Sequence, residues 1–161
     1  MFRFFSKQFE LRQVIKRYVA ILHGRLENPA GAEPWGTWRW ALAKTAGGRH
    51  RPEGTGRRQP ARTRYRILDR SDHYTMVEIE LLSGRKHQIR RHAKLSGHAV
   101  VGDVRYGSKR AADYLAKNYA FDRLALQAHA LTFRIPGGTE PETVTTPIIP
   151  NKMQNLFQND R

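Results

Sequence analysis

The chain contains no cysteine, which excludes disulfide bonds and thiolate metal sites. It is also poor in acidic residues, with 14 Asp and Glu against 29 Lys and Arg, so the formal net charge is +15. A balance this basic favours an anionic partner over a neutral metabolite. Nucleic acid is the first candidate, and an anionic membrane or an acidic protein are the alternatives.

Long hydrophobic runs are missing as well. The aromatic opening of the chain is interrupted by Arg3, Lys7 and Glu10, so it does not form the apolar core of a signal peptide. No later run is long enough to span a bilayer. We therefore expect a cytoplasmic protein with no membrane partner. The 161 residues fit one domain, residues 1–161, with no internal repeat.

Hydrophobic periodicity and turn residues predict an α+β fold, built on a mixed, mostly antiparallel sheet flanked by short helices. Expected strands cover residues 16–23, 37–42, 62–69, 74–82 and 123–135, with Trp38 and Trp40 on one face of the second. Expected helices lie within residues 2–15, at 85–95 and 108–119, and around Met153 and Phe157.

The stretch from Glu78 to Gly107 changes period midway. Its first residues alternate as a half-buried strand does, and Ser83-Gly84 then ends the alternation and supplies a helix N-cap. The helix expected next is closed by Gly97 in a left-handed position. It is dense in basic side chains, which predicts a phosphate-contacting edge beside a pocket. These side chains are Arg85, Lys86, His87, Arg90, Arg91, His92 and Lys94.

Residues 47–60 contain no hydrophobic side chain and include Arg57 and Arg58. One interpretation is a mobile, disordered basic loop. The other is an arm that contacts phosphates, and the two are compatible if the arm orders on RNA.

Four blocks of the sequence resemble motifs of the RluA-type RNA pseudouridine synthases. The run LSGRKHQIR at residues 82–90 resembles the signature L-T/S-G-R-x-H-Q-I-R, and GH at 97–98 with VGDVRYG at 101–107 resembles the next block. KRYVAILHG at 16–24 resembles K-x-Y-x-A-x-x-x-G. RLALQAHALTF at 123–133 resembles R-x-A-L-x-A-x-x-L-x-F.

The resemblance implies a monomer with the pseudouridine synthase catalytic fold, acting on ribosomal or transfer RNA without cofactor or metal. It implies that a flipped uracil stacks on Tyr18, whose hydroxyl helps remove a proton, while Arg90 pairs with a nucleophilic aspartate and Leu126 lines the base pocket. We expect further substrate contacts from Arg85, His87 and Gln88. RNA contacts are expected from Lys86, Arg91, Lys94, Arg57 and Arg58.

One part of that machinery has no match. The family's nucleophile lies in an H-R-L-D block before the tyrosine strand, whereas the seventeen residues before Tyr18 include no aspartate. We therefore expect the chain to begin downstream of that block and to be inactive alone. The run RILDRS at 66–71 imitates the block, but it follows the tyrosine strand and lacks the Ser-Gly, so Asp69 is an unfavoured nucleophile.

Two other functions remain open. The chain could be a non-catalytic RNA-binding or ribosome-associated module that keeps the scaffold, or, least favoured, a hydrolase using Asp69 or Asp103 with a histidine. Asp103 fits better as a cap of backbone amides in its G-D-x-x-Y-G turn. His87 and His92 are five residues apart and face different sides of a helix, so we reject a metal site.

Overall fold

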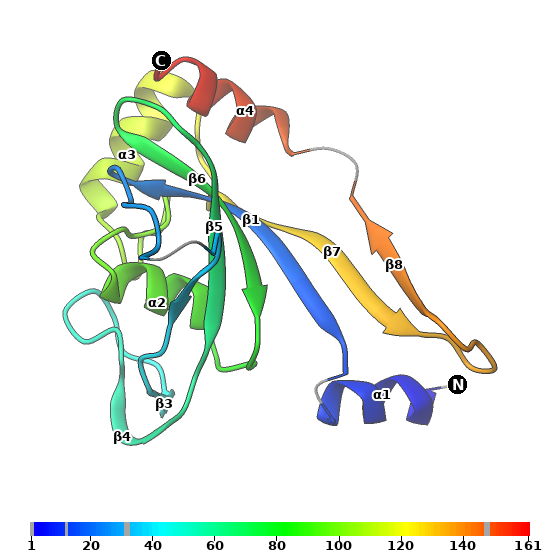
Figure 1. Cartoon of the computed structure of the whole chain (residues 1–161). Coiled ribbons are helices and arrows are strands. Elements are labelled where there is room, and N and C mark those ends of the chain that lie inside the picture. Colours follow the sequence, from blue (N-terminus) through cyan, green and yellow to red (C-terminus); the bar gives the residue numbers. More distant parts are fainter. Residues whose placement is uncertain (1, 12, 31–32, 147–148) are drawn as a thin grey trace.

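The computed structural model describes residues 2–11, 13–30, 33–146 and 149–161 and has an α+β architecture (Figure 1). Four helices are present in these ranges: α1 (Phe2–Glu10), α2 (Gln88–Leu95), α3 (Lys109–Tyr119) and α4 (Asn151–Gln158). The strands there are β1 (Ile15–His23), β2 (Gly36–Trp38), β3 (Leu42–Thr45), β4 (Thr55–Gln59), β5 (Thr63–Arg70), β6 (Tyr74–Leu81), β7 (Leu126–Arg134) and β8 (Pro141–Thr145).

Six strands form one sheet in the order β2-β5-β6-β1-β7-β8, and every neighbouring pair is antiparallel. This confirms the predicted fold class. The centre of the sheet is β1, whose residues 19–22 are buried on both faces. Side chains of α2, α3 and α4 complete the hydrophobic core, among them Ile89, Leu115 and Phe157.

The cross-strand register decides which side chains share a sheet face. Tyr18 is paired with Ile79 of β6, and Ile79 with Tyr65 of β5, so these three side chains point to the same side. The Tyr65 ring stacks on Trp38 with centroids 4.6 Å apart, and the Trp38 ring meets the edge of His92 of α2. Tyr18 therefore lies on the face that α2 covers.

The opposite face of the same strands carries ion pairs. Glu80 contacts Arg17 and Arg64, and Glu78 accepts a hydrogen bond from Arg66. The two glutamates, which the alternation placed on a solvated face, are thus buried beneath arginine side chains. Strand β6 is covered on both sides because long arginine side chains cover its polar row as well.

Three parts of the structure differ from the sequence interpretation. The strand predicted at 37–42 is wrong: β2 ends at Trp38 and β3 begins at Leu42, because Trp38 is buried against the sheet while Trp40 is 41% exposed. Residues 47–60, interpreted as a mobile basic loop or a phosphate-contacting arm, include β4, which forms a separate hairpin with β3. Strand β8 had no counterpart in the sequence interpretation.

Helix α2 begins at Gln88, three residues later than the pattern indicated. Ser83-Gly84 does not cap it; His87 occupies the N-cap position in a left-handed conformation, with φ of 55°, and its side chain makes no capping hydrogen bond. At the other end Gly97 has φ of +86°, which confirms the expected left-handed position. The basic segment is therefore half turn and half helix.

Candidate functional site

The turn before α2 is held by the side chain of Gln88. Its Oε1 accepts hydrogen bonds from the Ser83 hydroxyl (2.7 Å) and the Arg85 amide (3.0 Å). Its Nε2 donates to the Arg62 carbonyl (2.8 Å) and to Thr63 Oγ1 (2.9 Å) at the start of β5. Gln88 is 2% exposed, so the expectation that it contacts substrate is corrected. Its amide positions the turn instead.

His87, the residue just before α2, faces a buried tyrosine. Its Nδ1 lies 2.9 Å from the Tyr106 hydroxyl. Burial, followed by the positive charges of Arg90, Arg105 and Lys86, lowers the pKa of His87 below that of a free histidine. At neutral pH the imidazole is therefore uncharged and can form a hydrogen bond with a base or a phosphate.

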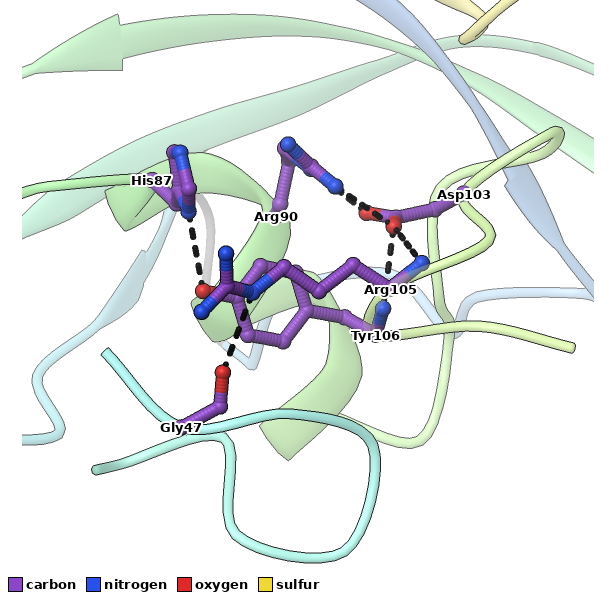
Figure 2. A network of polar contacts seen from close by, with 6 residues as sticks. All are labelled: Gly47, His87, Arg90, Asp103, Arg105 and Tyr106. Carbon is purple, nitrogen blue, oxygen red and sulfur yellow. Dashed lines mark hydrogen bonds and ion pairs between the residues drawn. The ribbon is translucent and has the colours of Figure 1, made fainter. Parts of the chain in front are cut away.

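Arg90 is bound to Asp103 through two parallel hydrogen bonds (Figure 2). Its Nε donates to Oδ2 at 2.7 Å and its Nη2 to Oδ1 at 2.8 Å. Oδ1 also accepts the backbone amides of Arg105 and Tyr106, which confirms that Asp103 caps its turn. Burial alone would raise the pKa of Asp103, but the bonds from Arg90 and the amides outweigh it and lower that pKa. The carboxylate is thus ionised and accepts four hydrogen bonds, three of them at Oδ1.

The same geometry leaves one edge of Arg90 available. A guanidinium has five N–H donors, and the bonds to Asp103 use only Nε and Nη2. Within the described residues, Nη1 of Arg90 makes no hydrogen bond. The Arg90 side chain is 20% exposed, so the residue is not closed off from solvent.

The Tyr106 ring supports this arrangement from below. It is fully buried, and the guanidinium groups of Arg90 and Arg105 lie 5.1 Å and 5.6 Å from its centroid. Arg105 also donates to the carbonyls of Ala46 and Gly47, as Figure 2 shows for Gly47. Sequence reasoning noted the block containing Tyr106 and Arg105 but assigned neither residue to the site.

Tyr18 and Leu126 are neighbours on the face covered by α2. Tyr18 is paired with Ala128 and Ala20 with Leu126, which places the two side chains in adjacent rows of that face. Burial raises the pKa of Tyr18, so its hydroxyl stays protonated at neutral pH. A cavity of about 220 Å³ adjoins Tyr18 and is otherwise lined by β1, β7 and the β8 region. The convergence of Tyr18 and Arg90 on one uracil stays a prediction.

The basic residues expected to contact RNA divide into two groups. Arg57, Arg58 and Lys86 are exposed, and Lys94 is partly exposed. Arg85 is partly buried and directs its Nε toward the Pro60 carbonyl (3.4 Å). Arg91, in contrast, is completely buried and cannot contact RNA directly, so that expectation is corrected.

The structure gives no support to Asp69 as a nucleophile or to a metal site in the described residues. Asp69 forms an ion pair with Arg161 and accepts the Arg70 amide. In the described ranges, no three His, Asp or Glu side chains gather as a metal site would require. The described helices also include none that is long and apolar enough to cross a membrane.

Comparison with known proteins agrees with this fold. A family model described as RNA pseudouridylate synthase matches residues 1–95. An uncharacterized RNA pseudouridine synthase of Chloroflexus aurantiacus is 30% identical over 154 residues, which cover 92% of this chain and 45% of that protein. Ribosomal large subunit pseudouridine synthase C of Vibrio vulnificus is 29% identical over 146 residues, 91% of this chain and 44% of the relative.

A tRNA pseudouridine synthase C of Haemophilus ducreyi is 28% identical, with 98% of this chain and 67% of that protein covered. Among solved structures, human RNA pseudouridylate synthase domain containing 1 superposes with a TM-score of 0.68 at 28% identity, covering 89% of this chain and 58% of that one. The chain spans about half the length of the first curated relatives. Since the family model covers more than half of the residues, the chain belongs to the RNA pseudouridine synthase family, in its RluA branch.

Proposed function

We propose that this chain supplies the base-binding tyrosine and the carboxylate-orienting arginine of an enzyme that isomerises uridine to pseudouridine in ribosomal or transfer RNA. The observation that carries the proposal is the arrangement of Tyr18 and Leu126 in adjacent rows of the sheet face covered by α2, the helix that holds Arg90. That arrangement unites three residues from distant blocks of the sequence on one side of the sheet.

Tyr18 receives the uracil in this proposal. A uridine in a folded RNA must leave its stack before its glycosidic bond can be attacked, and an aromatic ring compensates for the lost stacking. The cavity beside Tyr18 has room for such a ring. Because burial raises the pKa of Tyr18, its neutral hydroxyl can donate a hydrogen bond to the base or pass on a proton.

Arg90 orients the nucleophile. Its edge with Nη1 is available for a second carboxylate, and pairing with a cation keeps that carboxylate ionised and fixes its direction. Asp103 is a poor nucleophile in this proposal, because its side chain is completely buried and its Oδ1 already accepts hydrogen bonds from Arg90 and two backbone amides. We propose that the attacking aspartate comes from a polypeptide segment outside residues 1–161.

The RNA backbone docks on the exposed basic side chains. We assign this docking surface to Arg57 and Arg58 on β4, Lys86 beside His87, and Lys94 on α2; Arg58 also forms an ion pair with Glu53. Contacts of this kind position a nucleic acid without reading its sequence. The neutral His87 adds a hydrogen-bonding group among these charges.

The test is a tritium-release assay on ribosomal and transfer RNA, with the chain alone and after fusion to a segment carrying the H-R-L-D block. Turnover should appear only in the fusion. In the active fusion, Tyr18→Ala should abolish turnover and leave RNA affinity within a few-fold. Tyr114→Ala, an exposed tyrosine of α3, is the matched control and should change neither quantity. Full turnover in the Tyr18→Ala fusion would refute the assignment.

A second function is favoured by one contact. Arg90 already has a carboxylate partner in Asp103, which is what a non-catalytic RNA-binding module would need to keep its scaffold folded. If neither the chain nor the fusion isomerises any RNA while both bind RNA, the binding module is the correct description.

A further inference from the structure

Arg91 is buried, although the density of basic residues around it led us to expect an RNA contact. It is the largest of the fully buried side chains in the described residues, and no carboxylate pairs with it there. Burying a guanidinium costs free energy unless its donors are satisfied. Its environment must therefore supply hydrogen-bond acceptors, and the acceptors that it has indicate its role.

Those acceptors are four backbone carbonyls. Nε donates to Pro52 (2.5 Å), Nη2 to Glu53 (2.6 Å), and Nη1 to both Ala43 and Lys86 (3.1 Å each). The carbonyls of Ala43, Pro52 and Glu53 belong to the β3–β4 hairpin and its turn. The carbonyl of Lys86 belongs to the turn before α2. A single side chain thus joins the hairpin to the helix that holds Arg90.

Other ties between the hairpin and the domain lie at the β3 end, where Leu42 and Ala43 are buried and His92 contacts the Trp40 carbonyl. Strands β3 and β4 pair only with each other, and every residue of β4 is exposed. Arg105 adds two bonds from outside, to Ala46 and Gly47. The direction in which β4 presents Arg57 and Arg58 therefore depends on side-chain bonds and not on a continuous sheet.

We propose that Arg91 is a positioning residue for RNA binding, which fixes the β3–β4 hairpin against α2 so that the exposed strand β4, with Arg57 and Arg58, contacts the same RNA as the Arg90 site. This rests on the RNA-docking part of the proposed function. Arg91 acts only through the hairpin, since its own charge does not reach solvent.

The salt dependence of RNA binding separates positioning from direct contact. Each phosphate contact with single-stranded RNA contributes about 0.7 to the slope of log affinity against log salt. The probe is a labelled, uridine-rich single-stranded RNA, titrated by fluorescence anisotropy at several KCl concentrations. The double variant Arg57→Ala/Arg58→Ala should lower the slope by about 1.4. Arg91→Met should lower it equally, and the triple variant should lower it no further.

A glycine in the turn offers a second way to disturb the hairpin without changing any charge. Gly54 has φ of +80°, and a Cβ there would lie 2.1 Å from the Thr45 carbonyl oxygen and 3.0 Å from Arg91 Nη2. Gly54→Ala should therefore reproduce the reduced slope. Gly56→Ala is the matched control, because Gly56 has φ of +87° but nothing within 4 Å of the added carbon, and it should keep the wild-type slope.

Far-UV circular dichroism checks that each variant is folded. A wild-type slope in folded Arg91→Met and Gly54→Ala overturns the inference, as do equal losses in Gly54→Ala and Gly56→Ala. Additive losses in the triple variant overturn it too. If neither Arg91→Met nor Gly54→Ala folds, Arg91 serves general folding and the inference is wrong. An unchanged slope in Arg57→Ala/Arg58→Ala instead refutes RNA docking on the hairpin, which is a failure of the proposed function.

Discussion

Two β-ribbons of this domain end in a strand that is exposed along its whole length: β3–β4 and β7–β8. Ribbon β7–β8 continues the six-stranded sheet, whereas β3–β4 is a sheet of its own (Figure 1). Strand β4 carries two arginines, and β8, with the sequence PETVT, carries no basic residue. The ribbon that lies outside the sheet is thus the one with charges suited to RNA.

Each ribbon is also fixed by one buried polar side chain. Gln8 of α1 is 5% exposed, and its amide donates to the Arg134 carbonyl (2.9 Å) and accepts from the Arg134 amide (2.8 Å) at the end of β7. Arg91 binds four carbonyls around β3–β4 and α2. The neutral amide of Gln8 makes two bonds to the β7–β8 ribbon, which backbone hydrogen bonds already join to the main sheet. Among the described residues, the β3–β4 hairpin has no such backbone bonds to the main sheet, and the charged side chain of Arg91 makes four bonds around it.

Arg91→Met should produce the larger loss of stability. Four carbonyls lose their partner in a site closed to solvent, which we expect to lower the free energy of unfolding by about 3 kcal/mol. Urea denaturation measures the total, and hydrogen exchange should show faster exchange of the β3 and β4 amides than of those in β7. Equal acceleration in both ribbons would contradict the separate attachment of the hairpin.

Gln8→Ala should have a smaller effect, confined to the other ribbon. It removes two hydrogen bonds of ordinary strength, so we expect a loss of about 1–2 kcal/mol in urea denaturation. Faster exchange should appear at the end of β7, and the salt slope of RNA binding should stay at its wild-type value. A reduced slope would show that the β7–β8 ribbon also takes part in docking.

Lowering the pH should produce the smallest of these differences between the two ribbons, as a difference in protection from hydrogen exchange. His92 is buried between Thr63 Oγ1 and the Trp40 carbonyl, each 2.9 Å away, at the approach to β3. Burial lowers the pKa of His92 below its unfolded value, so its stabilising effect is complete above about pH 6.5 and declines as the pH falls toward the folded pKa. The amide of Gln8 does not titrate.

Hydrogen exchange at pH 7.5 and pH 5 should therefore show β3 losing more protection in acid than β7, with a difference of about 1 kcal/mol or less. His87 and His23 also have lowered pKa values, mainly through burial, and they reduce global stability in the same range. His92→Gln should remove the local difference only. If β3 lost protection equally in that variant, His92 would not be its cause.

The elements that followed from the sequence are those with strong periodic patterns or ordered motifs. The alternation in β6 and the β-branched run of β1 placed two central strands, and Ser108 caps α3 where the expected helix began. The motif blocks led to the correct family. The predicted start of α2 was wrong because a run of basic residues has the same sequence pattern in a turn as in a helix. The turn is held by the hydrogen bonds of Gln88, which the sequence does not show.

The burial of single polar residues followed no local rule. Adjacent residues Arg90 and Arg91 have the same side chain, yet one faces Asp103 at a partly open site and the other is enclosed by carbonyls of a hairpin about forty residues earlier in the chain. Likewise, the TGRRQ segment of β4 has the composition of a disordered loop, yet it forms a strand by pairing with β3, which its own sequence does not indicate.

The sequence by itself determined the α+β class and the family, because periodicity and ordered motifs are local properties of the chain. Tertiary structure alone decided that Gln88 and Arg91 are internal supports and that Arg90 keeps one edge available beside Asp103. The physical reason is that a polar side chain is buried only where distant backbone groups converge to satisfy its hydrogen bonds, and that convergence is a property of the complete fold.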